Sequence, residues 1–143
     1  MSSTPTVLFI CQHNAGRSQL GAHLLAHIAP GQVNATSGGL SPAEHINPVI
    51  AEALGELGID TSAAVPRAVT AADLAAADIV VTMKPRLALP GPVSGRLVEW
   101  EFLDPENWGI DGVRGLRDRI LAHIRILAAD LGTTAASSGQ VAG

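Results

Sequence analysis

The 143 residues are 47% hydrophobic and 15% charged and carry a formal net charge of −4, a composition that fits one globular domain. The acidic balance argues against a nucleic-acid partner, and no apolar run approaches the roughly 20 residues that span a membrane. Residues 1–5 lack the basic and apolar regions of a secretory signal. One cysteine, Cys11, precludes a disulfide within these residues and fits a reducing compartment, so we predict a cytoplasmic protein.

The first half of the chain predicts two strands, each followed by a helix. Val7–Ile10 is a short apolar run of the kind found in buried parallel strands, and the leucines of Arg17–Ile28 recur at helical spacing. Val33–Ser37 predicts a second strand. An Asn-Pro pair, a favoured helix start, then opens a helical pattern over residues 47–58.

The second half adds two strands and a long helix. Val69–Ala76 predicts a short helix, and Asp78–Met83 predicts a third buried strand. Lys84–Gly95 is rich in proline and glycine, so it is predicted to be a loop. Arg96–Trp100 predicts a fourth strand. Apolar residues at helical spacing over Leu116–Leu131 predict an amphipathic helix.

The order β-α-β-α-α-β-β-α predicts a single-domain, three-layer α/β/α fold with a four-stranded parallel sheet. We place the domain at residues 1–132 and predict a flexible C-terminal tail at residues 133–143, which are small and polar. Ligands of such folds bind beyond the carboxyl ends of the strands. Cys11, Met83 and residues 100–104 are all predicted to lie there.

One loop carries the chemistry. Between the first predicted strand and helix the chain reads Cys11-Gln12-His13-Asn14-Ala15-Gly16-Arg17-Ser18. Five residues between the cysteine and the arginine can curl so that their backbone amides converge on a tetrahedral oxyanion. The planar guanidinium of Arg17 can bind two oxygens of that anion, and the helix N-terminus adds positive charge. The predicted oxyanion-binding residues are Gln12, His13, Asn14, Ala15, Gly16 and Arg17.

Cys11 is the predicted nucleophile of this loop. The thiolate is the reactive form of cysteine, and a helix N-terminus together with the Arg17 guanidinium favours it over the thiol. Ser18 can donate its hydroxyl to the thiolate and later to the leaving sulfur. The residues expected to shape the loop are Gly16, through its backbone freedom, Asn14, through side-chain bonds to the backbone, and Gln12 and His13, through their main chain.

The departing oxygen needs a proton, which a carboxylic acid on a neighbouring loop can supply. Asp104 is the predicted general acid, because it follows the fourth strand and is stiffened by Pro105. The alternative carboxylic acids are Glu101, Glu106 and Asp111. The contrasting interpretation of the loop is a buried structural thiol, which would be inert.

Other polar and aromatic residues admit a structural interpretation. His23 and His27 have metal-ligand spacing, but no cysteine or acidic residue completes a site, so we predict partly buried structural histidines and no metal. Lys84 and Arg86 could contact a second anion or an acidic partner, or be solvated loop charges. Trp108 could wall an aromatic-substrate pocket or cap the core.

The run His13–Gln19 (HNAGRSQ) after VLFIC resembles the arsenate reductases built on the low-molecular-weight protein tyrosine phosphatase fold. Similarity continues through Ser37-Gly38-Gly39, Ile46–Asp60, Ala77–Met83 and Trp100–Pro105. The resemblance implies the strand order 2-1-3-4. It also implies that Cys11 is the nucleophile, Arg17 the oxyanion ligand and Asp104 the general acid, with Ser18 and Asn14 supporting the loop.

Two departures from the family bear on its partners. Thioredoxin-linked relatives carry further cysteines after the Thr-Met stretch, but this chain reads Thr82-Met83-Lys84-Pro85-Arg86. The resemblance therefore implies transfer of a Cys11–arsenic adduct to an external thiol, either mycothiol with a mycoredoxin or glutathione with a glutaredoxin. Some relatives bind potassium through a glutamate in the first helix. Ala22 stands there, so no ion and no bound cofactor is predicted.

Three functional hypotheses follow. The first is an enzyme that reduces arsenate to arsenite by way of Cys11 and an external thiol. The second is a low-molecular-weight phosphatase that hydrolyses phosphoesters through a phosphocysteine, with water as the second nucleophile. The third is a non-catalytic oxyanion-binding protein. We favour the first because the loop HNAGRSQ is typical of the reductase branch.

Overall fold

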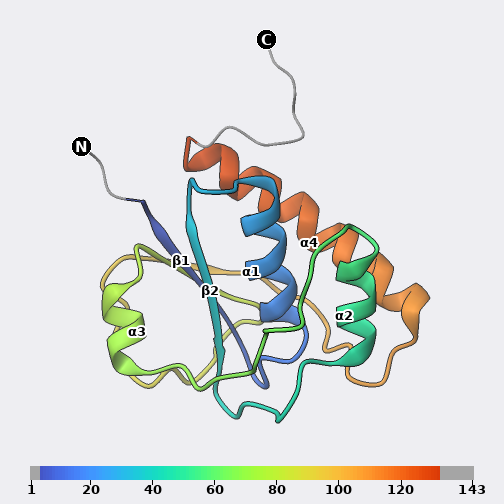
Figure 1. Cartoon of the computed structure of the whole chain (residues 1–143). Coiled ribbons are helices and arrows are strands. Elements are labelled where there is room, and N and C mark those ends of the chain that lie inside the picture. The colour runs from blue at the N-terminus through green and yellow to red at the C-terminus, as the bar shows by residue number, and fades with distance from the viewer. Residues whose placement is uncertain (1–3, 133–143) are drawn as a thin grey trace.

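Four parallel strands form the centre of the fold (Figure 1), and the computed structural model describes residues 4–132. The strands are β1 (Thr6–Cys11), β2 (Asn34–Gly39), β3 (Ile79–Thr82) and β4 (Arg96–Glu99). Their order is β2-β1-β3-β4, and every neighbouring pair is parallel. The predicted fold class and strand order are therefore confirmed. The tail predicted at residues 133–143 lies outside the described residues.

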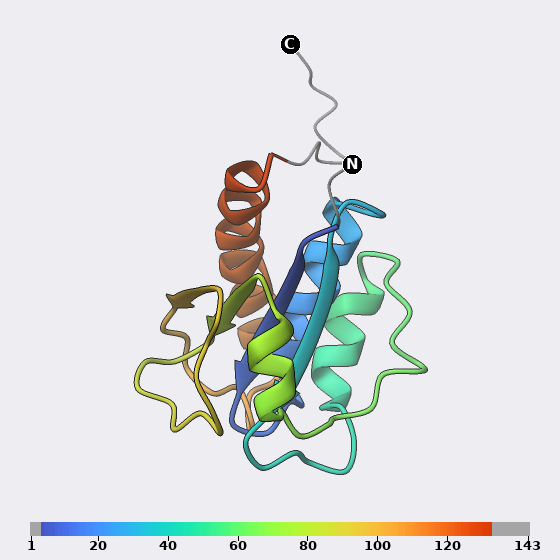
Figure 2. The same ribbon diagram turned by 90° about the vertical axis from the view of Figure 1, so that its left-hand side faces the viewer.

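Helices cover both faces of this sheet. Helices α1 (Arg17–Ile28), α2 (Pro48–Gly55) and α4 (Ile110–Asp130) pack on one face, whereas α3 (Ala71–Ala76) lies on the other (Figure 2). All four strands end at the same edge of the sheet. Within residues 4–132, no helix combines the length and the apolar composition that crossing a bilayer requires.

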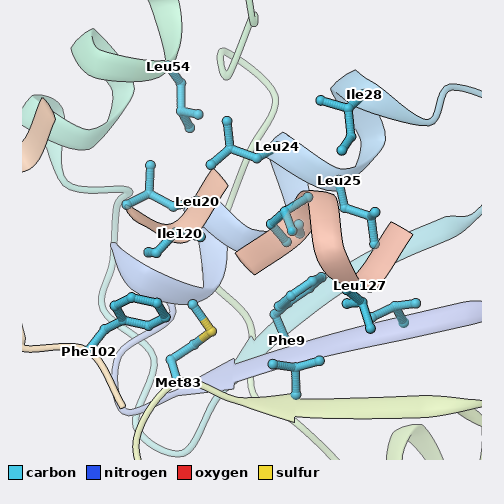
Figure 3. Close-up of a cluster of buried hydrophobic side chains, with 14 of the residues drawn as sticks. Phe9, Leu20, Leu24, Leu25, Ile28, Leu54, Met83, Phe102, Ile120 and Leu127 are labelled. Atoms are coloured by element: carbon cyan, nitrogen blue, oxygen red, sulfur yellow. The ribbon is translucent and has the colours of Figure 1, made fainter. Parts of the chain in front are cut away.

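Strand β1 is buried on both faces, which explains its continuous apolar sequence. Phe9 and Cys11 point toward α1 and α4, while Leu8 and Ile10 point toward α3. Figure 3 shows the larger of the two cores, where side chains of β1, α1, α2 and α4 meet. The alternation places the Cys11 side chain on the face where helix α1 begins.

Helix α1 lies directly against strand β1 because a glycine faces the sheet. A Cβ atom added to Gly21 would lie 2.5 Å from Cδ2 of Phe9, which is closer than side chains approach. Gly21 and Phe9 are thus packed at van der Waals distance. This close packing fixes the start of α1 relative to the end of β1. The predicted anion-binding loop connects these two ends.

Several boundaries differ from those predicted. Helix α4 begins at Ile110, six residues before Leu116, because Gly112 and Gly115 interrupt the helical pattern without interrupting the helix. Helix α3 begins only at Ala71, where Thr70 and Asp73 form a capping box. Strand β2 runs on to Gly39, which brings that residue beside Cys11.

An ion-pair network joins helix α2 to helix α4. Glu56 Oε2 accepts a 2.6 Å hydrogen bond from Arg114 Nη2, and Glu56 Oε1 accepts a 2.7 Å bond from Arg117 Nη1. Arg117 also donates to the carbonyl oxygen of Ala53 at 2.9 Å. The hydrogen bonds from Arg114 and Arg117 lower the pKa of Glu56 from 4.5 to about 2. The charged form of Glu56 is therefore favoured in the folded protein.

We expect Glu56→Gln to lower the melting temperature by a few degrees at pH 7. A depressed folded-state pKa contributes stability that is present above the unfolded pKa and lost as pH falls toward 2. The difference in melting temperature between the variant and the wild type should therefore shrink between about pH 5 and pH 2. Calorimetry across this range tests it. Glu52→Gln, within α2 one turn before Glu56 and outside the network, should show no such pH dependence.

Candidate active site

Cys11 ends strand β1 with its sulfur against a hydroxyl. Its Sγ lies 2.9 Å from Oγ of Ser18, in the first turn of α1, and the Cys11 side chain is buried, with 2% of its surface exposed. Ser18 Oγ also accepts a 2.7 Å hydrogen bond from Asn14 Nδ2. Because that bond occupies an oxygen lone pair, the Ser18 proton is free to point at sulfur. The arrangement can stabilise negative charge on Cys11.

The loop between Cys11 and Arg17 turns its carbonyl groups away from its centre. Six consecutive carbonyl oxygens accept hydrogen bonds from protein donors. The bonds join Cys11 O to Leu40 N (3.2 Å), Gln12 O to Ser41 N (2.7 Å), His13 O to Ala43 N (3.0 Å), Asn14 O to Gln19 Nε2 (3.0 Å), Ala15 O to Asn47 N (3.0 Å) and Gly16 O to Leu20 N (2.9 Å).

This pattern leaves the amides of the loop for a ligand. In a planar trans peptide the carbonyl and the following amide point in opposite directions. Within residues 4–132, the amides of residues 12–16 donate to no backbone or side-chain acceptor. Helix α1 also begins without a side-chain cap, so its first-turn amides remain open. The loop presents a set of converging donors to an anion.

Asn14 holds this loop in an uncommon conformation. Its φ angle is +53°, so the left-handed residue of the loop is Asn14 and not Gly16, whose φ is −135°. The Asn14 side chain is fully buried, and its Oδ1 accepts a 2.9 Å hydrogen bond from the backbone amide of Arg67. Because an amide can only donate, this bond orients Nδ2 toward Ser18. Asn14 thereby links a distant segment to the thiol.

Replacing Asn14 separates these two roles. Asn14→Gly keeps the left-handed backbone but loses both side-chain bonds, and we expect kcat to fall by roughly 10- to 100-fold. Asn14→Ala should lose the same activity and about 1 kcal/mol more stability, because alanine resists positive φ. Steady-state kinetics and urea unfolding of both variants measure the two effects. Wild-type kcat in Asn14→Gly would contradict the role given to its side chain.

Arg17 connects the loop to the segment that follows strand β4. Its guanidinium is nearly buried, and Nη1 donates a 2.9 Å hydrogen bond to the carbonyl oxygen of Phe102. The distance from Nη2 to Oδ2 of Asp104 is 3.9 Å. The Asp104 side chain is 44% exposed, and its Oδ1 accepts a 3.1 Å bond from the amide of Glu106. The predicted nucleophile, arginine and acid thus come from two loops at one edge of the sheet.

A pocket of about 310 Å³ opens over Cys11. Besides the loop it is lined by small or polar residues, among them Ala43, Pro48 and Pro105. Among the alternative acids, Glu106 lines this pocket, Glu101 lines a neighbouring one, and Asp111 instead pairs with Arg114 on α4. Trp108 packs on the core and is not part of the wall. The pocket therefore places a guanidinium and carboxylates above the Cys11 sulfur, with no aromatic wall from Trp108.

His23, His27 and His123 lie outside the pocket over Cys11. His23 is half-buried, lies 3.2 Å from Gln19 Oε1, and burial lowers its pKa. His27 is exposed, which corrects the expectation that it is partly buried, because it falls on the solvent side of α1. His123 contacts the rings of Trp100 and Phe102. Among residues 4–132 no three His, Cys, Asp or Glu side chains are grouped to hold a metal.

The segment at residues 40–47 is the part of the site that the sequence did not reveal. Its amides bind four of the six loop carbonyls. It can approach so closely because Gly39 lies beside the loop: an added Cβ would lie 2.9 Å from Asn14 N and 3.0 Å from Gln12 O. The Gly-Gly pair at 38–39 is the sequence signal for this close approach, but the segment that it allows to approach is the loop at Asn14, 25 residues earlier in the chain.

The fold and the loop together define an α/β protein with a Cys-x5-Arg loop, rich in unpaired amides, after its first strand. Residues 6–88 match the family described as low molecular weight phosphotyrosine protein phosphatase. The chain belongs to this family. A Staphylococcus epidermidis protein named arsenate reductase 1 is 32% identical over 126 residues, covering 86% of this chain and 95% of its own length.

Solved structures agree with this assignment. The thioredoxin-dependent arsenate reductase Cg_ArsC1' of Corynebacterium glutamicum is 36% identical, with a TM-score of 0.79 over 92% of this chain. This chain spans 63% of that one's length. The tyrosine phosphatase Wzb of Escherichia coli K30, solved with sulphate, shares the fold at 17% identity and a TM-score of 0.81, with 91% of this chain and 100% of Wzb covered.

Proposed function

We propose that this protein reduces arsenate to arsenite. The observation that carries the proposal is the loop around Cys11, whose free amides, buried thiol and Arg17 face a pocket lined by small or polar residues. The arsenate reductase names of the relatives support the same assignment. An inorganic anion needs these donors and no aromatic wall. The roles below are those that the sequence predicts.

In the first step the Cys11 thiolate attacks arsenic. Arg17 and the loop amides bind the oxyanion and stabilise the charge that builds on its oxygens. A sulfur–arsenic bond forms while an arsenic–oxygen bond breaks, and Asp104 donates a proton so that the hydroxyl leaves as water. Arsenic remains As(V) in this adduct. Ser18 stabilises the thiolate before attack and again when sulfur departs.

In the second step an external thiol completes the reaction, because the 143 residues hold no other cysteine. The thiol displaces Cys11 sulfur from arsenic and yields a free thiol–arsenate adduct. A second thiol, from a redoxin or a second small molecule, attacks the sulfur of that adduct. A disulfide forms, and the electron pair of the sulfur–arsenic bond reduces As(V) to As(III). Two thiols are oxidised for each arsenate.

Phosphoester hydrolysis is the second candidate, favoured by the phosphatase family to which the chain belongs. The first step is the same with phosphorus in place of arsenic. Water then attacks the phosphocysteine, and no reductant is consumed. The two functions differ only in the second nucleophile, which is an external thiol in the reductase and water in the phosphatase.

Arsenite formation with defined thiol systems tests the proposal. Purified protein is given arsenate with glutathione–glutaredoxin, mycothiol–mycoredoxin or thioredoxin–thioredoxin reductase, and arsenite is measured by chromatography with mass detection. Protein alkylated at its one cysteine is the control. Arsenite from either small thiol supports the proposal, whereas arsenite only with thioredoxin contradicts the external small thiol. No arsenite, with hydrolysis of an aryl phosphate, indicates the phosphatase. Binding without either turnover indicates an oxyanion-binding protein.

We expect Asp104→Asn to lower kcat for arsenate reduction by roughly 100-fold, because the leaving oxygen loses its proton donor. With aryl phosphates the loss should be larger for phenyl phosphate than for 4-nitrophenyl phosphate, whose leaving group needs no proton. Glu106→Gln, in the same pocket, is the matched control. If Glu106→Gln loses more activity than Asp104→Asn, the acid has been misassigned.

A further inference from the structure

A second pocket adjoins the candidate active site. It has a volume of about 410 Å³ and lies between the segment after β3 and the segment after β4. Arg17 and Asp104 line both this pocket and the one over Cys11. The two pockets therefore share a wall formed by these two side chains. Nothing in the first step of the reaction uses this space.

The second pocket has two cations without partners. Lys84 and Arg86 line it, are exposed, and form no ion pair with a carboxylate of residues 4–132. Glu101 lines the same pocket. Arg17 and Asp104 also line the pocket and lie 3.9 Å apart, so their charges offset one another and leave two cations and one carboxylate. This mixture complements a small zwitterion that carries more carboxylates than ammonium groups.

The conformation of Arg86 is a separate observation. Its φ angle is +61°, in the left-handed region that residues with side chains seldom adopt. Its amide donates to Glu99 Oε2 at 3.3 Å, which ties the loop to strand β4. Strained residues of this kind occur at ligand-binding sites more often than elsewhere. Leu103, 72% exposed on the opposite wall, adds an apolar surface.

We propose that this pocket binds the external thiol, and that the thiol is a peptide-like molecule with carboxylates of the glutathione type. This assignment rests on the proposed function, which requires a thiol from outside the chain. Lys84 and Arg86 bind the carboxylates and Glu101 binds the ammonium group. The wall of Arg17 and Asp104 that this pocket shares with the pocket over Cys11 is where the thiol would meet the oxyanion. Mycothiol carries no carboxylate and would not use the two cations.

The test compares the double variant Lys84→Ala/Arg86→Ala with the wild type. With arsenate saturating, we expect KM for glutathione to rise roughly 5- to 10-fold, the sum of two exposed ion pairs, while KM for arsenate changes less than twofold. KM for mycothiol should not change. The matched control is Arg119→Ala/Arg125→Ala, which removes two exposed charges from α4.

A binding measurement separates failure of this inference from failure of the proposed function. S-methylglutathione cannot react, so its binding to the wild type by NMR does not depend on turnover. We expect it to shift the amides of Lys84, Arg86 and Leu103, and to bind more weakly to the double variant. If the wild type makes no arsenite but S-methylglutathione binds as described, the assignment of the pocket is supported and the proposed arsenate reductase activity is contradicted.

Three outcomes overturn the inference. One is an absence of binding by S-methylglutathione to the wild type at millimolar concentration. Another is an equal rise in KM for glutathione in the α4 control variant, which would indicate net charge and not the pocket. The third is a rise in KM for glutaredoxin and not for glutathione, which would assign the two cations to a protein surface.

Discussion

Cys11→Ser should abolish arsenite formation and aryl phosphate hydrolysis, each by ~10⁴-fold or more. A serine hydroxyl is a far weaker nucleophile than a thiolate, and no second cysteine in the 143 residues can replace it. Binding should survive, because the loop amides and Arg17 do not depend on the sulfur. Arsenate or phosphate titrated into the variant by calorimetry should bind with an affinity within a few-fold of the wild type.

The wild type offers a parallel measurement on the same atom. Iodoacetamide can label only one thiol, so loss of activity should follow incorporation of one label at Cys11, read by mass spectrometry. Phosphate should slow the labelling, since it occupies the pocket over the sulfur. Residual turnover above one part in a thousand in Cys11→Ser would mean that the chemistry lies elsewhere.

Arg17→Lys should lower kcat/KM by roughly 10²- to 10³-fold. Lysine keeps the positive charge but has no planar fork, so it cannot bind two oxygens of the anion together. It also loses the 2.9 Å bond from Nη1 to the carbonyl of Phe102, which directs the guanidinium into the pocket. Kinetics with arsenate and an aryl phosphate should show the loss for both, because the first step is shared.

The matched control is Arg96→Lys, an exposed arginine at the start of β4. We expect it to retain kcat/KM within twofold of the wild type. The affinity for phosphate separates the two effects expected of Arg17→Lys, which are weaker binding of the anion and weaker stabilisation of the transition state. A weakening of at most about 10-fold, with the rest of the loss in kcat, would place much of the contribution of Arg17 in the transition state. An unchanged kcat/KM would remove Arg17 from the oxyanion site.

Much of the fold could be predicted because its signals are local. The strand before Cys11 is a continuous apolar run, and the helix after Arg17 has leucines at helical spacing, so both elements and their junction were placed correctly. The Asn-Pro pair at 47–48 likewise marked the start of α2, where Asn47 Oδ1 accepts a hydrogen bond from the amide of Val49. The start of α4 was missed because glycines weaken helix propensity, while packing of the helix against α1 and α2 compensates.

The support of the site could not be predicted in the same way. Which backbone groups of the Cys11 loop face a ligand depends on donors in residues 40–47, and no local pattern encodes that pairing. The bond from the Arg67 amide to Asn14 joins residues 53 apart. The sequence predicts which groups react, since their chemistry is in the side chains, but the orientation of those groups is a property of tertiary contacts.

The outward-turned carbonyls of the loop have a consequence for selectivity. Because six of them are already bound to the protein, the loop amides are oriented before any anion arrives, and amides alone recognise the charge and shape that tetrahedral oxyanions have in common. Phosphate and arsenate have the same geometry and similar charge. We expect inorganic phosphate to be a competitive inhibitor with an inhibition constant close to the KM for arsenate. Discrimination between the two anions then lies in the steps that follow their capture.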